Sequence, residues 1–188
     1  MFRYLYLVVL LIMTSCTSQN NIDINEYPMV TTIYEIANNY NIKIDKSGKY
    51  ETAKVTSYFD GAKELEYEYE LIETGVFDPL YYSITIETEP TIEDAKLSFS
   101  IGKGVADLVG NSFEQGIVRI DSVAIPGDDS FYALQTYEGE PIGMVLKIRR
   151  RKAIFTMIIS GMYTLDHSLI KDLIIPKLSN LDKFKVKK

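Results

Sequence analysis

The sequence predicts an α+β domain with a mainly antiparallel β-sheet of about six to seven strands, covered by two or three helices. Segment 64–71 alternates glutamate with apolar residues at period two, which is the pattern of a half-buried strand. Asp60-Gly61, just before it, is a strong signal for a hairpin between antiparallel strands. Elsewhere apolar residues recur at helical spacing, and each such stripe needs a sheet face to cover.

Three segments have the apolar spacing of a helix. The first is expected over about 28–40. The second starts at Thr91, which with Asp94 has the form of a capping box, and runs to about residue 109. The third starts near residue 166, and Pro176 should kink or end it.

Seven segments have the composition and spacing of strands. Within the last of them, segment 154–159 is continuously apolar apart from Thr156, which predicts a central strand covered on both faces. The predicted strands are 52–59, 64–71, 81–89, 116–125, 130–138, 143–149 and 153–160.

The N-terminus has the pattern of an export signal. Arg3 is followed by an apolar run over 4–13, which is about half of the ~20 residues that a membrane-spanning helix needs. Small residues Thr14 and Ser15 follow, and Cys16 is the only cysteine in the chain. An intrachain disulfide is therefore excluded.

The sequence Met13-Thr14-Ser15-Cys16 resembles the lipobox of bacterial lipoproteins. The resemblance implies cleavage before Cys16, acyl chains on that residue, and a location at the bacterial cell envelope with membrane contact through those chains. The usual pattern has Leu at the place of Met13 and Gly or Ala at that of Ser15. Because Thr17 is not the aspartate that retains some lipoproteins at the inner membrane, the outer membrane is favoured, on its periplasmic face or surface. The alternative is an ordinary secretory signal with a chance cysteine.

The domain organisation predicted from these features has four parts. They are a signal peptide over 1–15, a tether over 16–26, a single domain over 27–182 and a basic tail over 183–188. The formal net charge of −6 argues against nucleic acid as a partner, because phosphate contacts dominate that affinity.

The order of elements over 52–181 resembles the PsbP/DcrB-like α/β/α sandwich. The resemblance lies in order and length and is carried by no diagnostic motif, and the helix expected over 28–40 departs from that fold. It implies a non-enzymatic accessory or binding protein.

A row of four glutamates lies on one face of the strand predicted over 64–71. On a strand such side chains are ~6.5–7 Å apart, so the row is a weak candidate for a calcium site or a catalytic carboxylate pair. The alternative is a solvated sheet face opposite Lys54 and Thr56 on the preceding strand. The four residues are Glu64, Glu66, Glu68 and Glu70.

The densest basic cluster comprises Arg149, Arg150, Arg151 and Lys152 at a predicted hairpin tip. It is a candidate contact for a partner, and a solvated turn is the alternative. His167 is flanked by Asp166 and Ser168, but neighbours on a helix do not face each other, so they are not expected to form a triad.

These observations favour a lipid-anchored envelope accessory protein that binds another protein, including the immunity or inhibitor type. No catalytic residue and no cofactor is predicted. The alternatives are a lipoprotein that binds a small ligand or a cation, and a carboxylate-based hydrolase using Glu66 and Glu68.

Overall fold

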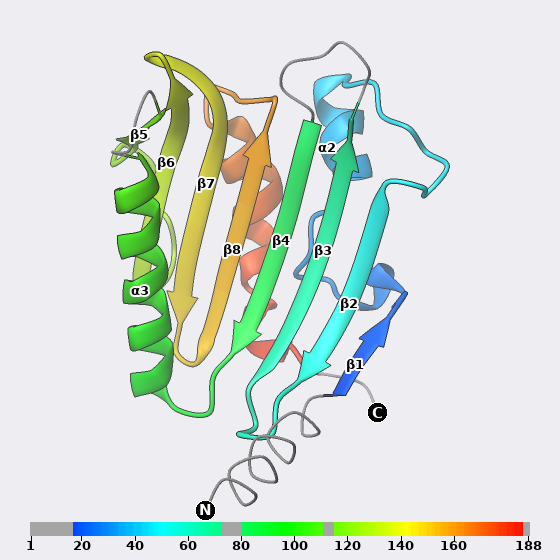
Figure 1. Cartoon of the computed structure of the whole chain (residues 1–188), viewed down its shortest axis with the longest axis vertical. Helices are drawn as coiled ribbons and strands as arrows, with labels where there is room; N and C mark the ends of the chain where they lie inside the picture. The colour runs from blue at the N-terminus through cyan, green and yellow to red at the C-terminus, as the bar shows by residue number, and fades with distance from the viewer. Residues whose placement is uncertain (1–16, 73–79, 111–114, 186–188) are drawn as a thin grey trace, which may run out of the picture.

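The computed structural model describes residues 17–72, 80–110 and 115–185, and within them it shows one antiparallel sheet of eight strands (Figure 1). The strands lie in the order β1-β2-β3-β4-β8-β7-β6-β5. The α+β class and the antiparallel sheet are confirmed, whereas the predicted count of six to seven strands is too low. The strands are β1 (Thr17–Asn20), β2 (Glu51–Ser57), β3 (Lys63–Leu71), β4 (Leu80–Thr88), β5 (Gln115–Arg119), β6 (Asp129–Tyr137), β7 (Glu140–Arg150) and β8 (Ala153–Ser160).

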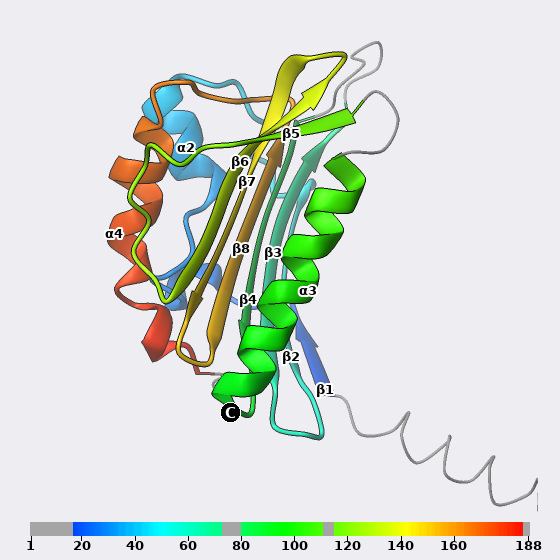
Figure 2. The ribbon, with the colours of Figure 1, turned by 90° about the vertical axis from the view of Figure 1, so that its left-hand side faces the viewer.

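Helices lie on both sides of this sheet (Figure 2). Of the described helices, α3 lies on one side, and α2 lies on the other together with α4 and the π-helical segment η2 that leads into it. The helical elements are η1 (Ile24–Glu26), α2 (Ile33–Tyr40), α3 (Ile92–Gly110), η2 (Leu169–Ile174), α4 (Ile175–Leu178) and η3 (Leu181–Lys183).

The larger core lies between the sheet and the side that carries α2 and α4. Tyr67 and Tyr82 are fully buried there, with their rings edge-on at 6.1 Å. The Tyr67 hydroxyl accepts a hydrogen bond from the Ile33 backbone N–H at 3.2 Å, and the Tyr82 hydroxyl donates to the Thr31 carbonyl at 2.7 Å. Because both hydroxyls have partners, these rings add buried area without leaving an unpaired polar group.

A second, smaller core lies under α3. Ala95 and Phe99 of this helix are buried against the outward side chains of β6, β7 and β8. The strand residues of this core are Phe131, Ala133, Val145 and Ile154.

The first long helix starts later than the sequence predicts, at Ile33 rather than near residue 28. Thr32 sets this start, because its hydroxyl accepts from the Glu35 backbone N–H while the Glu35 carboxylate accepts from the Thr32 backbone N–H. This reciprocal capping satisfies donors that a helix start leaves unpaired. Met29 and Val30 are buried, but they belong to the chain leading into the helix.

The segment predicted as a tether, 16–26, is part of the folded domain from Thr17 onward. β1 pairs with β2, and η1 follows it. Ile22 and Ile24 pack against the larger core. The domain therefore starts about ten residues before the predicted boundary at residue 27.

The strand predicted over 116–125 is shorter, since β5 ends at Arg119. Ile120 still donates its backbone N–H to the Tyr132 carbonyl of β6 at 2.9 Å. The chain after it contributes to the larger core, where Val123 is buried and Ile120 and Ile125 pack at its margin. Their apolar side chains therefore serve packing outside the sheet.

The helical segment near the C-terminus does not end at Pro176. The chain is π-helical through Ile174 and continues as α4, with Pro176 in the first turn of that helix. A proline is tolerated there because the first turn needs no N–H donor from it. The helix also starts at Leu169 rather than at residue 166, because His167 has a left-handed φ of 58°.

Candidate functional site

Among the described residues, helical cover extends over only half of the width of one sheet face. α3 contacts β5, β6, β7 and β8, and no described helix lies over β2, β3 and β4 on that side (Figure 1). We call this uncovered half the open face. Its outward side chains are Thr52, Lys54, Thr56, Glu64, Glu66, Glu68, Glu70, Tyr81, Ser83, Thr85 and Glu87.

The open face is strongly acidic. The whole predicted glutamate row lies on it, Glu87 of β4 stands directly opposite Glu64, and Lys54 is its one basic residue. The predicted cross-strand pairing is confirmed by the register, which places Lys54 opposite Glu66 and Thr56 opposite Glu64. Lys54 Nζ lies 2.6 Å from Glu66 Oε2.

The carboxyl groups of the open face perturb one another. Burial, together with the adjacent carboxylate of Glu66 and the charge of Glu87, raises the pKa of Glu64 to about 7. Burial also raises the pKa of Glu87, against the opposing charge of Lys147. Burial acts to raise the pKa of Glu66 as well, but its interactions with Glu64 and Lys54 outweigh burial and lower it. The Glu64 carboxyl group is therefore partly protonated near neutral pH.

Two glutamates of the row also accept hydrogen bonds from tyrosine hydroxyls. Tyr58 donates to Glu64 and Tyr81 donates to Glu68, each at 3.1 Å. These bonds hold the two carboxylates close to the sheet surface.

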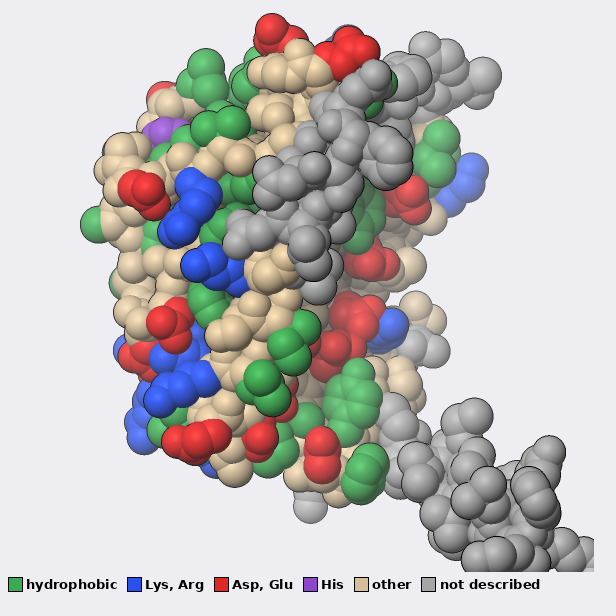
Figure 3. Space-filling view, turned by 60° about the vertical axis from the view of Figure 1, so that its left-hand side comes forward, with side chains coloured by type: hydrophobic (Ala, Val, Ile, Leu, Met, Phe, Trp, Pro, Cys, Tyr) green, Lys and Arg blue, Asp and Glu red, His purple; other side chains and the backbone are tan. Residues whose placement is uncertain are grey.

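The helix that covers the other half of this sheet face, α3, carries two exposed apolar side chains. Leu97 and Ile101 of α3 are 61% and 57% exposed, while Phe99 between them faces the sheet. Ser98 donates to the Glu89 carboxylate just after β4 at 2.6 Å, which turns this flank of the helix toward β4. Figure 3 shows acidic side chains gathered in a hollow beside hydrophobic ones on this side of the molecule.

Two small hollows lie on the open face. One hollow of about 280 Å³ is lined by Thr52, Glu68 and Glu70 among others, and one of about 240 Å³ by Glu64 and Glu87 among others. Pockets for small organic ligands are commonly ~300–1,000 Å³. Within residues 17–72, 80–110 and 115–185, no three His, Cys, Asp or Glu side chains converge to hold a metal ion.

The basic cluster is divided by the structure, and Arg149 is not available to a partner. Its side chain is buried on the α3 side, with the residue only 4% exposed. Its guanidinium lies 2.6 Å from the Asp129 carboxylate and 3.1 Å from that of Asp128. Because successive residues of a strand point to opposite faces, the Arg149 side chain lies on the α3 side of the sheet and the Arg150 side chain lies on the other side.

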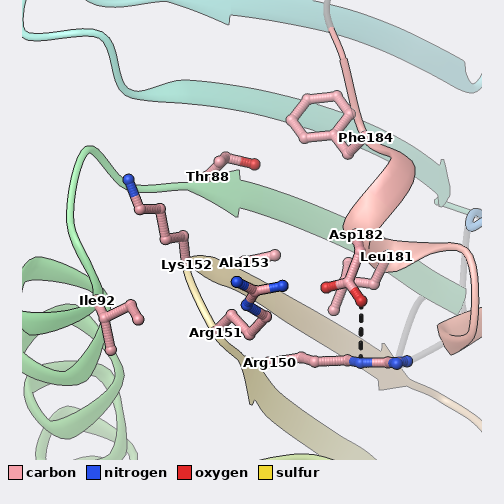
Figure 4. A pocket seen from close by; sticks show the side chains of 9 residues that line it. All are labelled: Thr88, Ile92, Arg150, Arg151, Lys152, Ala153, Leu181, Asp182 and Phe184. Atoms are coloured by element: carbon pink, nitrogen blue, oxygen red, sulfur yellow. Dashed lines mark ion pairs between the residues drawn. The ribbon is translucent and has the colours of Figure 1, made fainter.

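The other three residues of the cluster line a hollow of about 240 Å³ at the β7–β8 turn (Figure 4). Arg150 pairs with Asp182 at 3.2 Å and donates to the Leu178 carbonyl at 3.4 Å. Arg151 and Lys152 occupy the exposed turn.

His167 does not form a triad with its neighbours. Its Nδ1 lies 2.9 Å from the hydroxyl of Tyr132, on β6, and the two rings meet edge-on. Ser168 donates to the Asp166 carboxylate at 2.7 Å, and bonds from Ser168 and Thr164 lower the pKa of Asp166 to about 2. The expected lack of a triad agrees with this geometry, although these residues form a turn rather than a helix. The contact with Tyr132 spans 35 residues, and no local pattern could have shown it.

The predicted lipid attachment residue, Cys16, lies outside the described residues, and the next residue, Thr17, begins β1. Across the part of the chain that the structure describes, each helix is too short or too polar to cross a bilayer. Comparisons with protein-family models, curated proteins and solved structures found no match, so the lipobox and PsbP/DcrB-like resemblances remain predictions.

Proposed function

We propose that this protein is a lipid-anchored accessory protein of the bacterial cell envelope, and that it binds a basic segment of another protein on its open face. The observation that carries the proposal is the unequal cover of one sheet face. α3 shields the β6–β8 half, whereas the β2–β4 half presents five glutamates against one lysine.

Electrostatics favours a cationic occupant. Glu64 and Glu87 are directly opposite one another, and like charges in that position destabilise a sheet. The raised pKa of Glu64 reflects burial first, then the adjacent carboxylate of Glu66, and then this repulsion by Glu87. A partner that brings lysine or arginine side chains relieves the repulsion, and complementary charge also speeds the encounter and restricts the choice of partner.

Exposed apolar side chains on α3 complement the acidic side chains of the open face. Protein interfaces usually contain an apolar centre with a polar rim, and charged pairs at the rim contribute little affinity by themselves. Leu97 and Ile101 offer exposed apolar area on α3, the helix that covers the other half of the same sheet face. An amphipathic basic segment can therefore contact both.

The N-terminal sequence supports the location. The lipobox-like sequence ending at Cys16 implies acyl chains that tether the domain. An acidic domain gains little from anionic lipid overall, so covalent lipid is a suitable anchor. Immunity or inhibitor proteins directed against a basic toxin form one class with this chemistry.

The test uses the full chain with a C-terminal tag, crosslinked in cells and purified from solubilised envelope. The Glu68→Lys/Glu70→Lys variant reverses charge on the open face, and Glu138→Lys/Glu140→Lys makes the same change at the exposed β6–β7 turn. We expect one protein to be recovered with the native chain and the turn variant, and lost with the open-face variant.

Recovery that is equal in all three proteins would contradict the proposed contact. A crosslinked partner segment without excess lysine and arginine would contradict its proposed chemistry. A Cys16→Ala chain tests the anchor separately, because it should leave the membrane fraction while keeping its fold.

A further inference from the structure

The chain leaves the described domain toward Cys16 at one end of the sheet. Thr17 pairs with Ser57, and the register continues across the sheet from Ser57 to Lys63, Thr88, Ala153 and Arg150 in turn. We call the edge of the molecule marked by this row the Thr17 end. Since neighbouring strands lie ~4.8 Å apart, the row spans roughly 24 Å from Thr17 to Arg150.

An exposed aromatic side chain projects from the Thr17 end. Phe59 lies in the turn between β2 and β3 and is 74% exposed. Its neighbour Asp60 is held in the turn, where its carboxylate accepts the Ala62 backbone N–H at 2.9 Å. Aromatic side chains are favoured at the boundary between water and a bilayer.

The basic hollow of Figure 4 lies at the same end. The charge of Arg150 is compensated by Asp182. Neither the Arg151 guanidinium nor the Lys152 ammonium pairs with a carboxylate within the described ranges, and Lys152 donates to the backbone carbonyl of Pro90. Apolar walls flank these two cations, formed by Ile92, Ala153, Leu181 and Phe184.

We propose that the Thr17 end rests on the membrane surface, with Phe59 at the headgroup level and Arg151 and Lys152 on the phosphate of an anionic lipid. The proposal rests on the acylation of Cys16 in the proposed function. Peptide geometry places Cys16 within about 3.8 Å of Thr17, measured between Cα atoms, so the acyl chains enter the bilayer beside this end. Each basic side chain at an anionic surface strengthens binding there.

This orientation has a consequence for the partner. The Thr17 row runs across the strands, so resting it on the bilayer directs the strands away from the membrane. The open face then stands upright and remains accessible from the aqueous side. A flexible tether without docking would leave that orientation unspecified.

The first test measures which end approaches the lipid. Acylated full-length protein is reconstituted in vesicles of phosphatidylcholine with phosphatidylglycerol, and carries a fluorophore on Phe59→Cys or on Glu138→Cys at the opposite end. Acylation blocks Cys16, so the introduced thiol is the single labelling site. We expect a nitroxide on the lipid headgroups to quench the label at position 59 severalfold more than that at position 138, and equal quenching would overturn the orientation.

The second test measures the role of the two cations. Arg151→Ala/Lys152→Ala is compared with Lys43→Ala/Lys46→Ala, whose residues are exposed on the chain leading to the start of β2, at the other end of the sheet. All of these proteins carry the label on Phe59→Cys. Adding phosphatidylglycerol to phosphatidylcholine should increase quenching at position 59 in the labelled protein without a further substitution and in the labelled control variant. In Arg151→Ala/Lys152→Ala, the ratio of protein docked on the bilayer through its Thr17 end to undocked protein should fall by about an order of magnitude. If phosphatidylglycerol increases quenching in Arg151→Ala/Lys152→Ala as much as in the control variant, the proposed phosphate contact would be overturned.

The intact mass of the protein separates this proposal from the one on which it rests. A chain with an unmodified Cys16 would overturn both the proposed anchor and the docked orientation. An acylated chain that quenches equally at both ends would overturn the orientation alone.

Discussion

The two halves of the α3-side sheet face have the same strand geometry and opposite chemistry. Over β6–β8 the outward side chains include Phe131, Ala133, Val145 and Ile154, and α3 buries them. Over β2–β4 the equivalent positions are mostly glutamate, threonine and serine, and no described helix covers them. Alternation at period two is enough to form a strand, whereas the residue class on the second face decides whether a helix packs there.

At the boundary between the two halves, a charged side chain lies beside the apolar core under α3. Lys147 of β7 lies half-buried under α3, where burial lowers its pKa and the charge of Glu87 opposes that effect. Gly102 lies beside it, and a Cβ at that helix position would meet only the flexible end of the Lys147 side chain.

The largest effect is expected where α3 is anchored. Replacing Phe99 with Ala removes a buried ring from the smaller core and should lower the free energy of unfolding by about 3 kcal/mol. Leu97→Ala on the exposed side of the same helix should change it by less than ~0.5 kcal/mol. Urea unfolding of both variants measures the difference, and equal losses would mean that α3 does not pack as described.

The next largest effect should come from Arg149. Replacing it with Ala leaves Asp128 and Asp129 without their cation and should cost about 2 kcal/mol of unfolding free energy. Arg151→Ala, in the adjacent turn, should change stability by less than ~0.5 kcal/mol. Chemical denaturation tests this contrast, which fails if the two substitutions have the same effect.

The open face should make stability depend on pH near neutrality. Glu64 titrates near 7 in the folded chain against an ordinary value of 4.5, so the folded state binds more protons between these values. The free energy of unfolding should therefore fall as the pH rises from about 5 to 8. Glu87 contributes with the same sign, and Lys54 and Glu66 are the other charged groups beside Glu64.

Glu64→Gln should reduce this slope in urea unfolding measured at several pH values. Glu70→Gln, at the exposed end of the row, is the matched control and should retain it. An unchanged slope in Glu64→Gln would show that Glu64 does not carry the proton.

The smallest effect on stability is expected for Lys54. Its ion pair with Glu66 is half exposed, so Lys54→Ala should cost no more than about 0.5 kcal/mol. The same change removes the lone cation of the open face and should tighten binding of a basic partner. Titration of the purified partner, once identified, measures this, and weaker binding would contradict an electrostatic contact.

Local chemistry predicted most of the strands correctly. The Asp60-Gly61 turn fixed the pairing of β2 with β3, including Lys54 opposite Glu66. The capping sequence at Thr91 correctly marked the start of α3, and Thr91 accepts the Asp94 backbone N–H as a cap does. These features depend on residues close together in the sequence, which is why they could be read from it.

Features that depend on distant residues were not predicted. β1 has the polar sequence TSQN and forms a strand because the edge of β2 offers unpaired backbone groups. The pairing of β4 with β8 brings together segments about 70 residues apart. The burial of Arg149 depends on Asp128 and Asp129 across a strand pair.

Site-specific photo-crosslinking in cells tests most directly whether the open face is the interaction surface. A photoreactive residue is placed at Glu70 on the open face, at Leu97 on α3, or at Lys171, which is exposed on the opposite side of the sheet. The proposed function predicts that positions 70 and 97 capture the same envelope protein through a lysine- and arginine-rich segment, while position 171 does not. Capture from position 171 alone, or equally from all three positions, would contradict it.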